Sequence, residues 1–288
     1  MGKLDQMNST AKLNLFSLLF FTCLQGEVLN RPKEIVVDKD HPQPAWIGDL
    51  RIGAMLKKLP EGYKVKVGVK TRWWDSPTGL LSYALVMTPL NPAGKPDGTE
   101  IHNWNWYQGP SRTVVYKDGL KHGVEKKYAR AQKYDVKLKR NVDLNVPVAL
   151  IPWVKGKIHG TKRILHPNGQ TSSEIQYEQG IPKGVSRTFD DKGKVTKVIP
   201  YAEGKMHGEV RDFWSNGKTK RLVRFKKGKV DGLASEYYLS GQVKWERPFK
   251  NNLQHGVEKH FEADGKLHRI KYWIVGEEVS KTKYRALK

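Results

Sequence analysis

Histidines recur at corresponding places along this chain, and their type first suggests a metal centre. Four of them directly precede a glycine: His122, His159, His207 and His255. Zinc requires all its ligands within about 2.0 to 2.3 Å of one ion. If each repeat adds two strands about 4.8 Å apart, His159 and His207 lie roughly 19 Å apart. They cannot share an ion, so we expect no metal and predict that each histidine hydrogen-bonds the backbone of its connector.

Paired acids are the other residues that suggest chemistry. Asp190-Asp191 and Glu277-Glu278 are adjacent in the sequence, but neighbouring residues of a strand point to opposite faces and do not converge for acid-base work. The chain also contains no GxSxG motif, P-loop or dinucleotide fingerprint. We therefore expect neither catalytic residues nor a cofactor, and we expect a protein that is not an enzyme.

Two groups of side chains form the candidate binding surface. The aromatic group can stack on sugars or bases, or it can simply cap the open end of a sheet. The basic group offers a stripe for phosphates or carboxylates, because strand alternation puts Lys218, Lys220 and Arg224 on one face with Leu222. No aromatic residue shares that face, so nucleic acid is not the expected partner. The surface comprises Trp73, Trp74, Trp104, Trp106, Lys218, Lys220, Arg224, Lys226 and Lys227.

Composition supports an anionic partner and an extended shape. The 52 Lys and Arg residues against 29 Asp and Glu give a net charge of +23, which favours contact with polyanions or an acidic protein. The alternative is that the lysines keep a long exposed sheet soluble and protect its edges. An apolar content of 38% is low for one compact core, and it suits an elongated, one-sided fold.

The N-terminus resembles an export signal. Residues 13–24 (LNLFSLLFFTCL) are uncharged and follow Lys3 and Lys12. This stretch is shorter than the ~20 apolar residues of a membrane-spanning helix, but it suits the apolar region of a signal peptide. We predict a signal peptide over residues 1–26 and export to the periplasm, the cell envelope or the medium. A lipid anchor at Cys23 and a buried N-terminal helix are the alternatives, and a single cysteine excludes an internal disulfide.

The C-terminal half repeats itself every 24 residues. Three columns of glycine keep this period in register, and Asn252 fills one slot of the first column. Such self-similarity indicates an array of supersecondary units that bury their faces against one another. The columns are Gly156, Gly180, Gly204 and Gly228, then Gly160, Gly184, Gly208 and Gly232, then Gly169, Gly193, Gly217 and Gly241.

Each unit is expected to be a β-hairpin. Dipeptides such as Asn168-Gly169 and Asn216-Gly217 accept positive φ in tight hairpin turns. Large side chains, including Tyr201 and Phe225, recur at one position after these turns and form a shared core column. The predicted fold is all-β: an elongated antiparallel β-meander of tandem 24-residue hairpin repeats, with a smaller β-rich N-terminal region.

The same pattern divides the chain into segments. After the signal peptide we predict a linker over residues 27–45, a β-rich region over 46–106, the repeat array over 107–276 and a tail over 277–288. Gly119 and Gly156 are 37 residues apart, which is one period plus 13 residues. We therefore expect an insertion at about residues 129–146 that protrudes from the array.

Motifs of the form aromatic-x-x-Gly-x-x-His-Gly carry a family resemblance. They read Tyr116-Lys-Asp-Gly119-Leu-Lys-His122-Gly123, Trp153-Val-Lys-Gly156-Lys-Ile-His159-Gly160 and Tyr201-Ala-Glu-Gly204-Lys-Met-His207-Gly208. With them, residues 107–276 resemble MORN repeats of the bacterial variant type, although Lys183 and Asp231 replace the histidine in two units. The resemblance implies a single twisted antiparallel sheet used in scaffolding, self-association or placement at lipids. Bacterial members are often labelled putative antitoxins.

These observations predict an exported, non-catalytic repeat protein that binds through its sheet. The expected partner is a protein, or an anionic lipid or envelope polymer. The alternative function is that of an antitoxin-like protein that neutralises an effector by direct binding. Open sheet edges also allow a homodimer.

Overall fold

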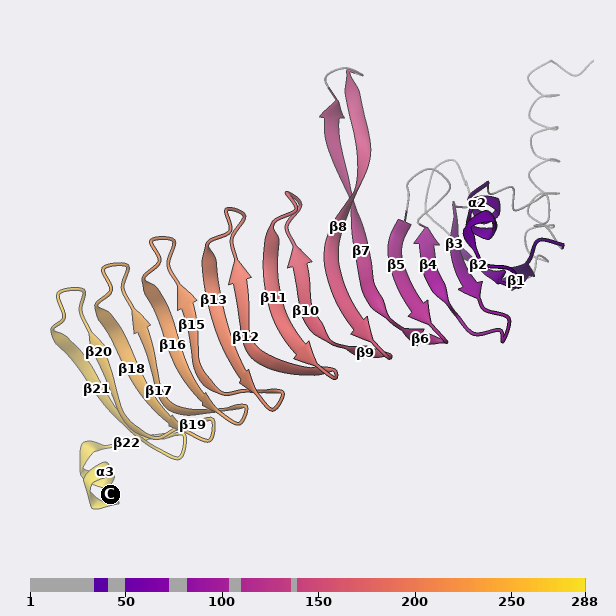
Figure 1. Cartoon of the computed structure of the whole chain (residues 1–288). Coiled ribbons are helices and arrows are strands. Elements are labelled where there is room, and N and C mark those ends of the chain that lie inside the picture. Colours follow the sequence, from indigo (N-terminus) through magenta and orange to yellow (C-terminus); the bar gives the residue numbers. More distant parts are fainter. Residues whose placement is uncertain (1–33, 41–49, 73–81, 104–109, 136–138, 288) are drawn as a thin grey trace, which may run out of the picture.

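The computed structural model describes residues 34–40, 50–72, 82–103, 110–135 and 139–287. Within these ranges, 22 strands form one antiparallel sheet in which strands that follow one another in the chain lie side by side. Figure 1 shows the hairpins arranged in one elongated row, with the C-terminal helix at the far end from the N-terminal strands. The predicted all-β meander is confirmed.

A small packed core lies at the N-terminal end of the sheet. Helix α2 covers one face there, and its Ile52, Met55 and Leu56 pack with Leu59 around Val65 and Met87. The spacing i, i+3, i+4, i+7 of these four apolar residues is that of an amphipathic helix, although we did not predict one. The elements are β1 (Glu34–Val37), α2 (Leu50–Lys58), β2 (Lys64–Arg72), β3 (Ser82–Leu90) and β4 (Gly98–Asn103). Strand β1 thus lies inside the segment expected as a linker.

The repeat array begins at β5 and ends in a short helix. Its strands are mostly six to nine residues long, with very short strands after one set of turns. Strand β22 and helix α3 lie in the segment expected as a tail. The elements are β5 (Pro110–Lys117), β6 (Leu120–Lys121), β7 (Gly123–Asp135), β8 (Arg140–Val154), β9 (Lys157–Ile158), β10 (Gly160–Leu165), β11 (Thr171–Glu178), β12 (Ile181–Phe189), β13 (Val195–Ala202), β14 (Lys205–Met206), β15 (Gly208–Phe213), β16 (Thr219–Lys226), β17 (Lys229–Tyr237), β18 (Val243–Lys250), β19 (Leu253–Gln254), β20 (Gly256–Phe261), β21 (Leu267–Ile274), β22 (Glu277–Val279) and α3 (Lys281–Ala286).

Each period contains two kinds of turn, which line the two long edges of the array. The first glycine column makes two-residue turns with both φ angles positive, as in Glu203 (53°) and Gly204 (76°), which is the type I′ geometry of tight hairpins. We call this row of turns the type I′ edge. Only the glycine has positive φ in Asn216-Gly217, where Gly217 N–H donates to Trp214 O over 2.9 Å. The hairpin turn predicted at this third column is therefore present, with positive φ at its glycine, and it is a longer turn closed by a glycine bulge.

In the part of the chain that the structure describes, the array is a single sheet without a second layer over it. Its buried side chains must therefore be covered by neighbouring side chains on the same face. Strand register places Val210, Val223 and Phe225 on the same face. This face, which we call the aromatic face, carries one large residue per unit: Tyr116, Trp153, Tyr177, Tyr201, Phe225, Phe249 and Trp273. It also holds the buried Val114, Ala149, Ile151, Val210 and Ala234. The alternation predicted from sequence is confirmed by this register.

On the opposite face, glycines of the second column meet prolines. A β-carbon at Gly256 would lie 2.8 Å from Pro248 Cγ, and one at Gly208 would lie 3.3 Å from Pro200 Cγ. The adjacent His255 N–H donates to Pro248 O over 3.0 Å, so the strand keeps a hydrogen bond although the proline cannot donate one. These glycines are needed for the close approach of the chain to the proline rings.

Replacing Gly256 by alanine should lower the free energy of unfolding by about 2 to 3 kcal/mol, because the new methyl group meets Pro248 and φ is +123°. The matched control is Gly169→Ala, which also has positive φ but nothing within 4 Å of the added carbon. It should cost about 1 kcal/mol. Urea denaturation of the variants measures both values, and equal losses would show that the proline contact is unimportant.

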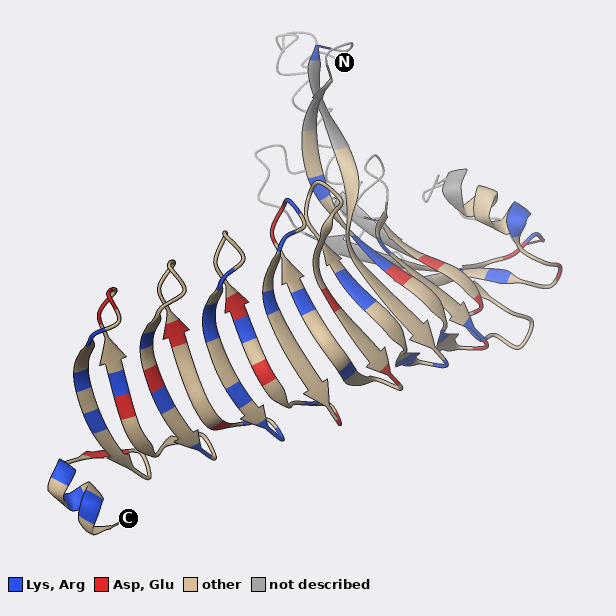
Figure 2. Ribbon diagram, turned by 60° about the vertical axis from the view of Figure 1, so that its left-hand side comes forward, with Lys and Arg blue, Asp and Glu red and all other residues tan. Residues whose placement is uncertain are grey.

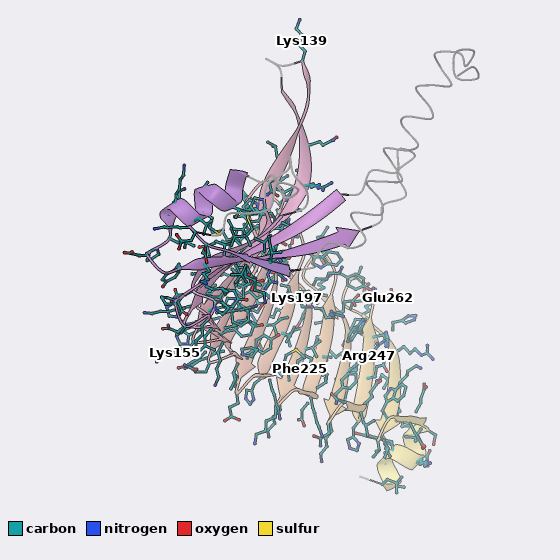
Figure 3. The ribbon with its side chains drawn as sticks, turned by 90° about the vertical axis from the view of Figure 1, so that its right-hand side faces the viewer. Lys139, Lys155, Lys197, Phe225, Arg247 and Glu262 are labelled. Atoms are coloured by element: carbon teal, nitrogen blue, oxygen red, sulfur yellow. The ribbon has the colours of Figure 1, made fainter. Side chains whose placement is uncertain are left out.

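A two-stranded ribbon projects from the array. Strands β7 and β8 pair from Gly123–Trp153 out to Asp135–Arg140, so the expected insertion at 129–146 forms the outer part of a long hairpin. Figure 3 shows Lys139 at the tip of this ribbon, with Lys155 and Glu262 on opposite long edges of the array. Figure 1 shows the ribbon rising from the same edge as the longer turns.

Candidate binding surface

The structure describes the basic residues of the candidate surface but not its tryptophans. Trp73, Trp74, Trp104 and Trp106 lie outside the described residues. Of the basic group, Lys220 and Arg224 lie on β16, whereas Lys218 precedes the strand and Lys227 follows it.

Three of the five basic residues are engaged locally. The Lys218 ammonium donates to Ser240 O in the next turn. The Lys220 ammonium lies 4.5 Å from the centre of the Trp214 ring, a cation–π contact. Arg224 forms an ion pair of 3.2 Å with Glu209 on the neighbouring strand. Lys218 thus links two neighbouring turns, whereas Lys220 and Arg224 make their contacts within one hairpin. All three contacts leave less of the predicted stripe for an external anion.

Lys226 and Lys227 remain exposed, and they belong to a group of five lysines on three adjacent units. None of the five side chains has an ion-pair partner among the described residues. Figure 2 shows Lys and Arg in blue at several turns of the type I′ edge. We call this group the lysine cluster: Lys205, Lys226, Lys227, Lys229 and Lys250.

Hydrogen bonds between neighbouring type I′ turns position the lysine cluster. Gly228 N–H donates to Met206 O, and Asn252 N–H donates to Val230 O, each over 2.8 Å. The Lys205 stem crosses to the next turn, since a β-carbon at Gly228 would lie 3.6 Å from Lys205 Cβ. Sequence reasoning did not single out Lys205 and Lys250, although the 24-residue period itself places these turns side by side.

Asn252 shows how a non-glycine residue fits this row. It adopts φ of 72°, which asparagine tolerates better than most residues, and its Oδ1 accepts a hydrogen bond of 2.7 Å from Val230 N–H. The side chain thus adds a second link between the two turns. The departure from glycine at this position strengthens the row instead of interrupting it.

A buried carboxylate organises the C-terminal end of the aromatic face. Glu258 Oε1 accepts hydrogen bonds from Arg247 (2.8 Å) and His260 (2.5 Å), and Oε2 accepts them from Gln254 (2.6 Å) and Trp273 (2.7 Å). Burial alone would raise its pKa, but the hydrogen bonds from His260, Gln254 and Arg247 outweigh burial and lower the pKa to about 2. All its strong acceptor directions are occupied by donors of the same chain, so Glu258 has a structural role.

The same arrangement recurs near the other end of the array. Glu125, also buried, accepts from Arg112 Nε (2.8 Å), Lys121 Nζ (3.3 Å) and Trp153 Nε1 (3.0 Å). Burial opposes ionisation, but Arg112 and Lys121 hold the pKa of Glu125 below its usual range. Glu125 and Glu258 each lie two residues after a second-column glycine, and each contacts the tryptophan of the aromatic column. That spacing was a readable signal which sequence reasoning missed.

A third carboxylate borders a hollow on the N-terminal part of the aromatic face. Glu100 accepts from Thr88 Oγ1 over 2.7 Å and contacts His102 Nε2 at 2.6 Å. Burial opposes ionisation here as well, and the bonds to His102 and Thr88 lower the pKa of Glu100. The hollow has a volume of about 560 Å³ and is lined by Val36, Lys66, Gly68, Val86, Thr88, Leu90, Gly94, Pro96, Glu100 and His102.

Two of the recurring histidines contact backbone, but they do so in the following type I′ turn and not in their own connector, where the contact was predicted. His207 Nδ1 accepts from Lys227 N–H at 3.5 Å, and His255 Nδ1 accepts from Val275 N–H at 3.3 Å. Each therefore links its connector to the next type I′ turn. Among the described residues, no three His, Cys, Asp or Glu side chains are grouped closely enough to hold a metal ion. None of the described helices has the length and apolar character to cross a membrane.

Comparisons with known proteins identify the repeat. The family model described as "MORN repeat variant" matches residues 206–227 and 230–251. No curated protein matches the chain. A solved structure of a TarM mutant from S. aureus, in complex with fondaparinux, alpha-GlcNAc-glycerol and UDP, matches with 12% identity and a TM-score of 0.20. The match covers 65% of this chain and 23% of that chain, and at this TM-score it supports no conclusion about function.

Proposed function

Because residues 206–251 are two tandem MORN repeats of the variant type, we propose that this chain is a non-catalytic binding protein whose lysine cluster contacts an anionic partner. The observation that carries the proposal is the group of five exposed ammonium groups on three adjacent turns, with no ion-pair partners among the described residues. Lysine is a compact, mobile point charge. Such a group suits a surface that displays many carboxylates or phosphates better than one rigid small anion.

The rigid array supports this role by fixing the spacing of the turns. Backbone hydrogen bonds join consecutive turns, so the lysines follow one another at roughly 10 Å intervals, two strand spacings. A partner with negative charges repeated along its surface would satisfy several of them together. An acidic protein surface and an anionic component of the cell envelope share this chemistry.

Export is part of the proposal and rests on the uncharged segment 13–24. It would bring the lysine cluster to the cell envelope. Mass spectrometry of the protein purified from its native cell measures the N-terminus directly. A mature chain that begins near residue 27 is the expected result. An intact N-terminus in the cytoplasm would instead favour the antitoxin-like alternative, in which the same array binds an intracellular effector.

The double substitution Lys226→Glu with Lys227→Glu should weaken binding to an anionic probe by about tenfold or more at low salt, because attraction becomes repulsion at two exposed sites. Phosphatidylglycerol vesicles and poly-glutamate serve as probes in sedimentation and in fluorescence titration, and they distinguish a lipid surface from an acidic polypeptide. The matched control is Lys281→Glu with Lys283→Glu on α3, which changes net charge equally. Binding of the native chain to neither probe, or equal losses in both double variants, would contradict the proposal.

A further inference from the structure

The C-terminal edge of the sheet is only partly covered. Strand β21 pairs with β20 from Leu267 to Trp273, but β22 pairs only with Tyr272, Trp273 and Ile274. Helix α3 packs at that same end, where the ring centroids of Tyr284 and Tyr272 lie 5.3 Å apart, and Figure 1 shows it beside β22. Among the described residues, nothing pairs with the outer edge of residues 267–271. Their outward N–H and C=O groups are therefore free to bond another strand.

The internal joints show how a further strand would pair. Adjacent hairpins pair next to the type I′ turn and again at two positions farther along the strands. Those positions are Lys197–Asp212 with Val198–Arg211 in one joint, and Trp245–His260 with Glu246–Lys259 in another. The 24-residue period maps Lys197 and Trp245 onto Arg269, and it maps the residue after each onto Ile270. The free edge thus presents the same two positions that every preceding hairpin uses to hold its neighbour.

Charge across these joints identifies the residue expected opposite Arg269. Each cation of this column has an acid on the facing strand. Arg112 faces Lys127 but pairs with Glu125 of the same strand at 2.8 Å, whereas Lys197 faces Asp212 itself, with an ion-pair distance of 3.4 Å. Likewise, Arg221 faces Glu236, and Arg221 also contacts Asp212 at 2.7 Å. Arg269 is exposed and has no ion-pair partner among the described residues. A carboxylate on a facing strand would give Arg269 the acidic partner that the equivalent cations have.

Apolar side chains beside Arg269 are also left exposed. Leu267 is 51% exposed and Ile270 is 40% exposed, whereas the preceding equivalent of Ile270, Glu246, is partly covered by its neighbouring strand. A strand on this edge would cover Ile270 on the face opposite Arg269, since adjacent residues alternate. The fitting segment is extended, with an acid on one face and apolar or long-stemmed residues on the other.

A second copy of this chain fits the edge poorly. In an antiparallel pair with aligned aromatic faces, a two-fold centre at Arg269 sets this arginine against itself, and a centre at Ile270 sets it against Lys271. A centre at His268 sets it against Leu267, so none of these registers supplies a carboxylate. Like charges directly opposite each other destabilise a strand pair. We propose that the 267–271 edge of β21 binds an extended acidic segment of a different protein by strand addition, with a carboxylate opposite Arg269.

The test is an NMR titration of the full-length protein. The probe is a short acetylated and amidated peptide of alternating threonine and valine with one central glutamate, and its twin carries lysine there. The glutamate peptide should shift the backbone amides of residues 267–271 and bind more tightly than its twin. Arg269→Glu should weaken glutamate-peptide binding by about tenfold and reverse the preference between the peptides. A glutamate peptide N-methylated along its pairing edge should not bind, because it cannot complete the ladder.

Two controls separate this edge from the lysine cluster. Lys192→Glu makes the same change in net charge in an exposed turn away from both β21 and the lysine cluster, and it should leave peptide affinity unchanged. In Lys226→Glu with Lys227→Glu, the glutamate peptide should still shift the amides of residues 267–271. Loss of those shifts in this double variant would assign the binding to the lysine cluster and overturn the edge proposal. It would also be overturned by shifts confined to other strands, by no saturation at millimolar peptide, or by a chain mass that doubles in sedimentation and returns to one copy in Arg269→Glu.

Discussion

Removing the Glu258 carboxylate should destabilise the C-terminal repeats more than removing an exposed carboxylate of the array. Glu258→Ala is expected to lower the free energy of unfolding by about 3 kcal/mol, because it strands four donors that now converge on one carboxylate. Those donors come from β18, β19, β20 and β21. The change should therefore loosen two hairpins together, which hydrogen exchange resolved by residue would measure.

The control for this prediction is Glu209→Ala. Glu209 forms ion pairs with Arg211 and Arg224, but these groups are largely exposed, and such pairs contribute at most about 1 kcal/mol. If Glu209→Ala and Glu258→Ala cost the same, the buried network would have no special weight. Glu258→Gln, which keeps the shape and some hydrogen bonds, should fall between them.

The same carboxylate predicts acid sensitivity. Its folded-state pKa of about 2 lies below the ordinary value of 4.5, so its contribution is fully present above pH 4.5 and is lost as the pH falls toward 2. After allowance for solvent screening at the open face, the contribution is about 2 kcal/mol. Chemical denaturation at pH 6 and near pH 2.5 should show this loss in the native chain and a smaller one in Glu258→Gln. Equal losses would contradict the assignment.

Buried carboxylates occupy two positions of one column in the array. The residues two after each second-column glycine are, in order, Glu125, Lys162, Ser186, Val210, Ala234 and Glu258. Val210 and Ala234 are buried, whereas Glu125 and Glu258 are each fixed by an arginine and a tryptophan. A hydrogen-bonded carboxylate ties adjacent strands directionally.

The repeat could be predicted from sequence because backbone geometry restricts the residue types at its turns. Type I′ turns need positive φ, and the close approach to Pro200 and Pro248 needs glycine. The length of the third-column turn could not be predicted from its dipeptide, because Asn-Gly suits both a two-residue turn and a glycine-closed longer turn. Flanking strand register, which a dipeptide does not encode, decides between them.

The site was less predictable because surface charges act through pairings that depend on register. Lys218, Lys220 and Arg224 form part of a basic run, yet a carbonyl, an indole ring and Glu209 occupy them. Lys205 and Lys250 are distant from that run in sequence but lie on adjacent turns. The 24-residue period predicts which turns lie side by side in the array. It does not predict which side chains form ion pairs or hydrogen bonds.

Replacing Ile52 by a smaller residue should destabilise the N-terminal end of the sheet. Ile52 is fully buried between α2 and the strands that carry Val65, Val67 and Met87, in the part of the chain where a helix adds a second layer. Ile52→Ala should lower the free energy of unfolding by about 3 kcal/mol, from lost burial plus the cavity that remains. Leu239→Ala is the matched control, because Leu239 is exposed in a turn, and its cost should stay below about 0.5 kcal/mol.

The pattern of loosening distinguishes a local core from a shared one. In a linear array each unit contacts mainly its neighbours, so instability introduced at one end spreads over few units. Hydrogen exchange in Ile52→Ala should therefore rise in β1, β2 and β3 while the amides of β15 to β21 keep their protection. Uniform loss of protection would mean that the array unfolds as a single cooperative unit whose stability depends on the N-terminal core.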